Sequence, residues 1–211
     1  MNKQITIIQP DDWHIHLRQG GMLQTVLPHT TRIFGRAVIM PNLRPPVVTT
    51  AQAAQYRDEI LAARPAGSDF TPLMTLYLTD GTDAEDVAHG YSEGVVTAVK
   101  YYPAHATTNS DHGVTDLRKV AKVLERMQQI GMPLLVHGEV TDADVDVFDR
   151  EAVFIDRVLG GLLHDYPKLK IVLEHITSRR GVEFVRAHGA SGRIAATITA
   201  HHLLINRNAM F

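Results

Sequence analysis

Cysteine is absent from the 211-residue sequence, which excludes disulfide bonds and thiolate metal ligands. Any zinc site would have to use histidine, carboxylate or modified lysine ligands. A long apolar run is also absent from the N-terminal segment MNKQITIIQP, which has only a short one before Pro10. Such a run is too short for a signal peptide or a membrane-spanning helix. We therefore expect a mature N terminus and a cytoplasmic protein.

A large excess of one charge is also lacking. The sequence has 21 Lys and Arg against 23 Asp and Glu, which gives a net charge of −2. This balance provides no bulk attraction to nucleic acid or to an anionic membrane. The apolar fraction of 45% and the charged fraction of 21% are typical of a globular protein. We expect a small-molecule substrate, and neither a nucleic acid nor a membrane as partner.

A repeat of about 30 residues is present, in which a short apolar run precedes a longer amphipathic segment. The apolar runs predict seven strands, at residues 5–9, 36–42, 70–78, 95–102, 132–140, 169–177 and 193–202. Strands that alternate with helices favour a parallel sheet of βαβ units. The expected fold is α/β, a (β/α)8 TIM-type barrel truncated after about seven strands, with residues 1–211 as a single incomplete domain. A doubly wound sheet is the main alternative.

Four segments carry the start and stop signals of helices: 49–67, 115–131, 149–167 and 178–189. The expected N-caps are Thr49 or Thr50 in the first segment, Thr115 in the second and Ser178 in the fourth. Gly131 and Gly189 are the expected stops of the second and fourth.

Reactive side chains recur near the ends of the expected strands: His14, His16, Asn42, Lys100, His137 and His175. In a barrel the active site lies at the carboxyl ends of the strands, so these side chains are expected to meet. A single histidine in such a place is usually a hydrogen-bonded loop residue. Several candidates at equivalent positions of separate units are harder to attribute to chance.

The spacing in His14-Ile15-His16 suits a metal site, because residues two apart on a strand point to the same side. His137 and His175 each follow an apolar run that would support a neutral imidazole ligand. Lys100 ends an apolar run, where a charged ammonium is costly to bury. It is either an ion-paired lysine or an amine whose pKa falls on burial, so that carbon dioxide converts it to a carbamate able to bridge two metals.

The sequence resembles the amidohydrolase superfamily, and within it the bacterial short-chain dihydroorotase family. The resemblance covers the whole chain and rests on five motifs: DDWHIHLR (11–18), MPNLRPPVVT (40–49), VKYYPAHATTNSDHG (99–113), LLVHGE (134–139) and LEHIT (173–177). It implies a barrel of the metal-dependent hydrolase kind with two divalent ions, zinc by default. His14 and His16 would hold one ion, His137 and His175 the second, and carbamylated Lys100 would bridge them.

The resemblance also implies substrate contacts and a reaction. Arg18 and Asn42 would bind a substrate carboxylate, and Thr107 and Thr108 would belong to a mobile loop that closes over the ligand. The implied reaction is the reversible cyclisation of N-carbamoyl-L-aspartate to L-dihydroorotate in pyrimidine biosynthesis. In the hydrolytic direction a metal-bridging hydroxide would attack the ring amide. The alternatives are a related cyclic-amide hydrolase, such as a hydantoinase or dihydropyrimidinase, and a non-catalytic metal-binding barrel.

Other polar residues have weaker claims to a role. Asp11 and Asp12 would orient the first histidines, and Tyr102 would line the site. The remaining histidines considered are His105 and His112, expected in the loop, and His201 and His202, expected at the end of the seventh strand.

The family pattern also contains an aspartate at the end of the eighth strand, which serves as metal ligand and general base. That position would lie beyond Phe211, so we expect no catalytic base within these 211 residues. We expect the sequence to be an N-terminal portion of a longer polypeptide, with little activity by itself. The full-length protein is expected to be a homodimer.

Overall fold

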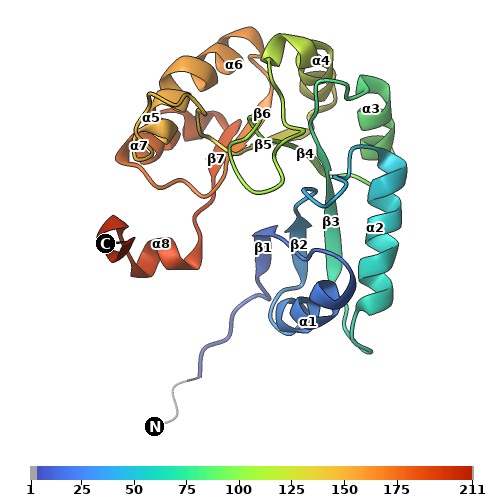
Figure 1. The fold of residues 1–211 in the computed structure, drawn as a ribbon. Helices are drawn as coiled ribbons and strands as arrows, with labels where there is room; N and C mark the ends of the chain where they lie inside the picture. The colour runs from blue at the N-terminus through green and yellow to red at the C-terminus, as the bar shows by residue number, and fades with distance from the viewer. Residues whose placement is uncertain (1–3, 211) are drawn as a thin grey trace.

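A computed structural model describes residues 4–210. Its centre is one parallel sheet of seven strands whose spatial order follows the sequence. Figure 1 shows the sheet curled on itself, with helices around its outside. The strands are β1 (Asp11–Ile15), β2 (Arg36–Ile39), β3 (Thr71–Tyr77), β4 (Ala98–Tyr101), β5 (Pro133–Val136), β6 (Lys170–Leu173) and β7 (Ile194–Ala196). The predicted incomplete barrel is confirmed, and the doubly wound sheet is wrong.

Helices connect successive strands and cover the outer face of the sheet (Figure 1). The α-helices are α1 (Gly20–Thr31), α2 (Thr50–Ala63), α3 (Ala84–Ser92), α4 (Ala121–Ile130), α5 (Arg150–Phe154), α6 (Gly160–Asp165), α7 (Arg179–His188) and α8 (Ala200–Leu204). A π-helical turn, η2 (Ile155–Leu159), joins α5 to α6, and the 3-10 turns are η1 (Leu117–Val120), η3 (Gly189–Ser191) and η4 (Arg207–Met210).

The two faces of the sheet carry different side chains. Ala37 and Ile39 join the large apolar core between sheet and helices, whereas Val38 and Met40 join a small cluster inside the curl with Ala98 and Leu135. Successive residues of a strand point to opposite faces, so this alternation fixes which positions look inward. Residues that continue the inward series past a strand end therefore point towards the open end of the barrel.

Most of the predicted elements are present, with two corrections. The first strand is Asp11–Ile15, whereas the apolar run at 5–9 is exposed and has no regular structure. The prediction relied on apolar character and was wrong, because β1 lies at the edge of the sheet and is only half-buried, so its sequence can be polar. Thr115 is not the N-cap of its segment: Asp116 accepts from the Arg118 N–H, and Thr115 contacts Asp80 instead.

The other helix signals are confirmed. Thr49 forms a capping box at the start of α2, and the side chain of Ser178 accepts from the backbone N–H of Gly181 at the start of α7. Helix α4 ends at Gly131, whose φ of 71° is the left-handed conformation that glycine adopts without a steric penalty. Helices α1 and α3 were not singled out from the sequence.

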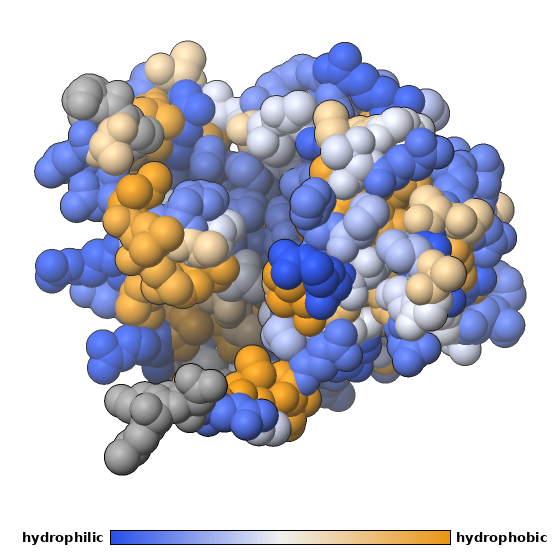
Figure 2. All heavy atoms as spheres, turned by 90° about the horizontal axis from the view of Figure 1, so that it is seen from below, coloured by the Kyte–Doolittle hydropathy of each residue, from blue (hydrophilic) through white to orange (hydrophobic). Residues whose placement is uncertain are grey.

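The two ends of the sheet are not joined. Among the described residues β1 pairs only with β2, and β7 pairs only with β6. Exposed apolar side chains lie near both ends of the chain, with Ile8 and Trp13 at one end and Leu203 and Leu204 at the other. Apolar patches are visible on the face drawn in Figure 2. Within residues 4–210 no helix is long and apolar enough to cross a membrane.

Candidate metal centre

His14 and His16 project to the inside of the curl from β1 and from the residue that follows it. Ile15 and Leu17 alternate with them and pack against the outer core. The Nε2 atoms of the two histidines are 3.1 Å apart, and their ring centroids are 5.0 Å apart. The predicted pairing of these imidazoles on one face is therefore present.

His137 and His175 bring two further imidazoles to the same place. His137 follows β5 on the inward series of Leu135, and its ring centroid lies 4.8 Å from that of His175. The ring of His175 is in turn 5.1 Å from that of His14. The structure thus connects all four predicted histidines through contacts between β1, β5 and β6.

The backbone of His175 explains how its ring reaches the centre. Val172 packs inside the curl, so Glu174 is the next inward residue and His175 would face the helices if the strand continued. Instead His175 has a φ of 43°, in the left-handed region that few residues other than glycine occupy. This turn places Glu174 and His175 on the same side.

Lys100 and Glu174 form a buried ion pair beneath the histidines. Lys100 Nζ contacts Glu174 Oε2, and the two side chains are 0% and 1% exposed. The other carboxylate oxygen of Glu174 lies 3.0 Å from Nδ1 of His14. Sequence analysis missed Glu174. The available signal was its position two residues after Val172, which predicts that its side chain also points to the inside of the curl.

Tyr102 closes the site behind the lysine. Its ring centroid is 4.9 Å from Lys100 Nζ and 6.2 Å from the ring of His137. The hydroxyl is buried without a hydrogen-bond partner among residues 4–210. Burial, the Glu174 carboxylate and the Tyr77 hydroxyl raise the pKa of Tyr102 well above its ordinary value. Tyr102 is therefore a neutral phenol that lines the site.

The electrostatics of the cluster keep two imidazoles neutral. Burial lowers the pKa of His16 to about 4, and the neighbouring His14 and Arg18 add to the shift. Burial also lowers the pKa of His175 to about 2, with a contribution from Lys100. Neutral imidazole is the form that binds a metal, so these two side chains need not lose a proton first.

Both pKa values of the buried pair are lowered, although burial acts on them in opposite directions. Burial lowers the pKa of Lys100, and the Glu174 carboxylate opposes this change. Burial raises the pKa of Glu174, but Lys100 and His14 outweigh it and bring the value down to about 2. Glu174 is thus ionised, and Lys100 is closer to its neutral form than an exposed lysine.

The donor set suits a divalent ion such as zinc. His14, Glu174 and His175 each offer one ligand atom, and these atoms lie within 4.8 Å of one another. Nδ1 of His16 and Nε2 of His137 are buried without a hydrogen bond in the described part of the chain, although Nε2 of His137 lies 3.6 Å from Oε1 of Glu139. Buried polar atoms normally have a hydrogen-bond partner, and nitrogens that lack one around one point fit a bound ion.

Arg18 and Asn42 meet at the mouth of the site. Arg18 Nη1 donates to the backbone oxygen of Asn42 at 2.9 Å, and Arg18 has a φ of 59°. Asn42 continues the inward series of Val38 and Met40, and its Nδ2 donates to the backbone oxygen of Thr108 at 3.1 Å. Thr108 and its neighbour Thr107 are exposed, in the loop after β4.

The outcomes differ among the other weaker candidates. Asp11 forms an ion pair with Arg36, and Asp12 accepts from the backbone N–H of His14, so the carboxylate at the His14 ring is Glu174 instead. His105 and His112 lie in the loop after β4, as expected. His201 and His202 were expected at the end of the seventh strand, but β7 is short and both belong to α8.

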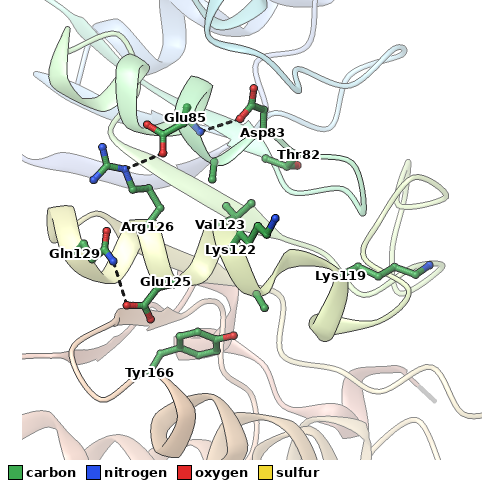
Figure 3. Close-up of a pocket in the computed structure, with 12 residues that line it drawn as sticks. Thr82, Asp83, Glu85, Lys119, Lys122, Val123, Glu125, Arg126, Gln129 and Tyr166 are labelled. Atoms are coloured by element: carbon green, nitrogen blue, oxygen red, sulfur yellow. Dashed lines mark hydrogen bonds and ion pairs between the residues drawn. The ribbon is translucent and has the colours of Figure 1, made fainter.

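A surface groove between α3 and α4 lies outside this site. Figure 3 shows acidic and basic side chains interleaved along it, including a Glu85–Arg126 pair at 3.4 Å. Its volume is about 770 Å³, and none of the predicted site residues line it. Paired charges leave this groove without an evident chemical preference.

The sequence matches the amidohydrolase family over residues 6–210. A curated relative, the dihydroorotase of Cupriavidus pinatubonensis, is 63% identical over 211 residues, which cover 100% of this chain and 61% of the relative. The dihydroorotase of Novosphingobium aromaticivorans is 62% identical over 210 residues, which cover 100% of this chain and 60% of the relative. The chain thus spans 60–61% of the length of these relatives.

Solved structures give a similar result. The dihydroorotase of Campylobacter jejuni matches with a TM-score of 0.86 at 39% identity, over 96% of this chain and 57% of that one. The Saccharomyces cerevisiae dihydroorotase in complex with 5-fluoroorotic acid has a TM-score of 0.86 at 32% identity, over 95% and 58% of the two chains. An L-hydantoinase from Arthrobacter aurescens has a TM-score of 0.76 at 14% identity, over 95% and 49%, which shows a shared fold alone.

Proposed function

The chain belongs to the amidohydrolase family, and on that basis we propose that it forms the metal-binding part of a dihydroorotase. The proposed reaction is the reversible ring closure of N-carbamoyl-L-aspartate to L-dihydroorotate with release of water. Relatives that carry this name are 62–63% identical over essentially the whole chain, whereas the hydantoinase is distant in sequence. The difference favours dihydroorotase over the cyclic-amide hydrolases that share the fold.

The observation that carries the proposal is the convergence of four histidines and Lys100 at one end of the curled sheet. We assign His14 and His16 to one ion and His137 and His175 to a second, with zinc as the proposed metal. Divalent ions held there would polarise an amide carbonyl and lower the pKa of a water molecule. The imidazoles of His16 and His175 are neutral and thus ready to serve as ligands.

Lys100 is proposed to bridge the two ions as a carbamate. Burial lowers its pKa, which favours the neutral amine whose nitrogen can bond to the carbon of carbon dioxide with loss of a proton. The carbamate has two oxygens and a negative charge, so it would leave the Glu174 carboxylate and turn towards the ions. Glu174 would keep its contact with Nδ1 of His14 and orient that ring.

Arg18 and Asn42 are the proposed binding site for the substrate carboxylate. A guanidinium donates two parallel hydrogen bonds to a carboxylate, and an amide N–H can add a third. Thr107 and Thr108 lie in a loop already tied to Asn42, and we propose that their hydroxyls approach the bound substrate. A ring without a carboxylate would leave the Arg18 charge unpaired, which is the proposed basis of selectivity.

Further parts of the proposal concern the whole protein. The remaining length of the relatives would supply an eighth strand between β1 and β7, together with the aspartate that acts as general base. This strand would pair with the free edges of β1 and β7. The homodimer and the cytoplasmic location stay predictions.

Turnover of dihydroorotate and of hydantoin by the full-length, metal-loaded protein tests the function. We expect hydrolysis of dihydroorotate and little or none of hydantoin. We also expect Arg18→Gln to raise the KM for dihydroorotate by tenfold or more, as loss of a charge-assisted bond of about 1.5–3 kcal/mol requires. Preference for hydantoin, or no turnover of either compound at full metal content, would overturn the proposal.

A further inference from the structure

The loop between β4 and η1 is folded around a buried serine. Ser110 is 0% exposed, and its hydroxyl donates to the backbone oxygen of Thr107 at 2.6 Å while accepting from the Thr107 N–H at 2.9 Å. A bridge between Pro103 and Val114 closes the base of the loop. The segment therefore has a defined shape, and its attachment to the site depends on particular side chains.

Asn109 makes that attachment. Its Nδ2 donates to the backbone oxygen of Asn42 at 3.1 Å, and its Oδ1 accepts from Arg44 Nε at 2.5 Å. Its own backbone oxygen accepts from the Tyr77 hydroxyl at 3.2 Å. The residue has a φ of 56°, a conformation in which asparagine is enriched because its short side chain can bond locally.

These bonds converge on the proposed carboxylate site. The backbone oxygen of Asn42 accepts from both Asn109 Nδ2 and Arg18 Nη1, so one atom joins the loop to the guanidinium. The Nδ2 of Asn42 donates to Thr108, the residue before Asn109. An amide nitrogen carries two N–H groups, so this bond fixes the plane of the amide and leaves one donor for a ligand.

We propose that Asn109 is a positioning residue for recognition of the substrate carboxylate, an inference that rests on the proposed function. Asn109 holds the loop against Asn42, and the loop in turn sets the direction of the free N–H of Asn42 beside Arg18. Without the Asn109 side chain the loop is attached less firmly and the two donors are no longer aligned in advance. Binding is then weaker, because the ligand has to order them.

Two substitutions test the role of the Asn109 side chain separately from that of its backbone conformation. Asn109→Gly removes both side-chain bonds and tolerates the left-handed φ, so no backbone strain is introduced. Asn109→Asp keeps an oxygen for Arg44 but places a second oxygen opposite the backbone oxygen of Asn42, where the donor was. His105→Gly is the matched control, since His105 also has a left-handed φ, of 65°, and its exposed ring forms an ion pair with Asp111 of the same loop, at 3.5 Å.

The experiment measures KM and kcat for dihydroorotate in the full-length, metal-loaded protein. We expect Asn109→Gly and Asn109→Asp to raise KM roughly tenfold with kcat within about twofold, because ground-state and transition-state binding are lost together. His105→Gly should leave both constants unchanged. An unchanged KM in Asn109→Gly, or an equal rise in His105→Gly, would overturn the proposal.

A second measurement needs no substrate. Hydrogen exchange of the amides in residues 104–113 should be faster in Asn109→Gly than in the parent and in His105→Gly, with metal content and unfolding midpoint unchanged. Equal exchange in all three proteins would overturn the attachment by Asn109. Failure of the parent protein to turn over dihydroorotate would count against the proposed function instead, so the two failures are distinguishable.

Discussion

Replacing Glu174 by glutamine tests the buried pair at the base of the site. Lys100 and Glu174 are 0% and 1% exposed, so neither charge is screened by water. Glutamine has nearly the size of glutamate and creates no cavity, but it removes the counter-charge of Lys100 and leaves one acceptor oxygen where Lys100 and His14 Nδ1 each face a carboxylate oxygen. Breaking one partner of a buried pair costs about 3–5 kcal/mol, because the remaining ion stays buried and uncompensated. We expect a loss of this size in metal-free protein.

Urea unfolding at neutral pH measures the change. Lys100→Met combined with Glu174→Leu should recover most of the lost free energy of unfolding, because an apolar pair of similar volume removes both buried charges. Asp156→Asn is the control: its partner Arg180 is bound at 2.5 Å, but both side chains are about half exposed and little change is expected. A loss below about 1 kcal/mol in Glu174→Gln, with the double variant no more stable, would refute the reasoning.

Three further outcomes are expected. Lys100→Ala should abolish binuclear metal binding, and an added short carboxylic acid or amine should restore part of it; unchanged metal per chain by atomic emission would contradict the bridging role. The pKa of His16 is lowered from 6.5 to about 4, so the folded state binds fewer protons than the unfolded chain between these values, and stability should fall as the pH drops from 6.5 to 4. In metal-free protein, His16→Asn should reduce that decline in urea titrations at each pH without abolishing it, because His175, with a pKa of about 2, contributes over the same range; an unchanged slope would show that His16 does not contribute. Gly113→Ala should disturb the loop, because a Cβ there would lie 2.5 Å from the backbone oxygen of Tyr102 and 2.9 Å from the backbone nitrogen of Ala104; normal hydrogen exchange of residues 104–113 would contradict this.

The sequence predicted best those features that one local interaction determines. Strand alternation places His14, His16 and His137 inside, and local capping chemistry sets the start of α7 at Ser178. Both signals depend on neighbours within a few residues. The barrel follows from the succession of such units, because parallel strands need helical crossovers of fixed hand.

Three features depended on distant parts of the chain and were not predicted: the bounds of the first strand, the role of Glu174 and the backbone conformation of His175. β1 is an edge strand with a polar sequence, so its hydrophobicity is lower than that of the exposed run before it. Glu174 gains its importance from Lys100, a residue on a different strand. The left-handed backbone at His175 redirects a ring that simple alternation would send outward. Each depends on tertiary contacts, which neither the hydrophobic periodicity nor the secondary-structure propensity of the sequence indicates.

The order of the strands has a consequence for folding kinetics. Each strand pairs with its predecessor across a single crossover, as in Asp11–Arg36 and Thr75–Ala98, so every pairing closes a much shorter loop than a contact between the two ends of the sheet. The contact between His14 and His175 is different, since it joins the first strand to the turn after the sixth. It can form only when the intervening sheet has curled, so it should appear late. The two proposed ions need histidines from both ends of the curled sheet, so we expect them to bind after the rate-limiting step of folding. They would then slow unfolding while leaving the folding rate nearly unchanged.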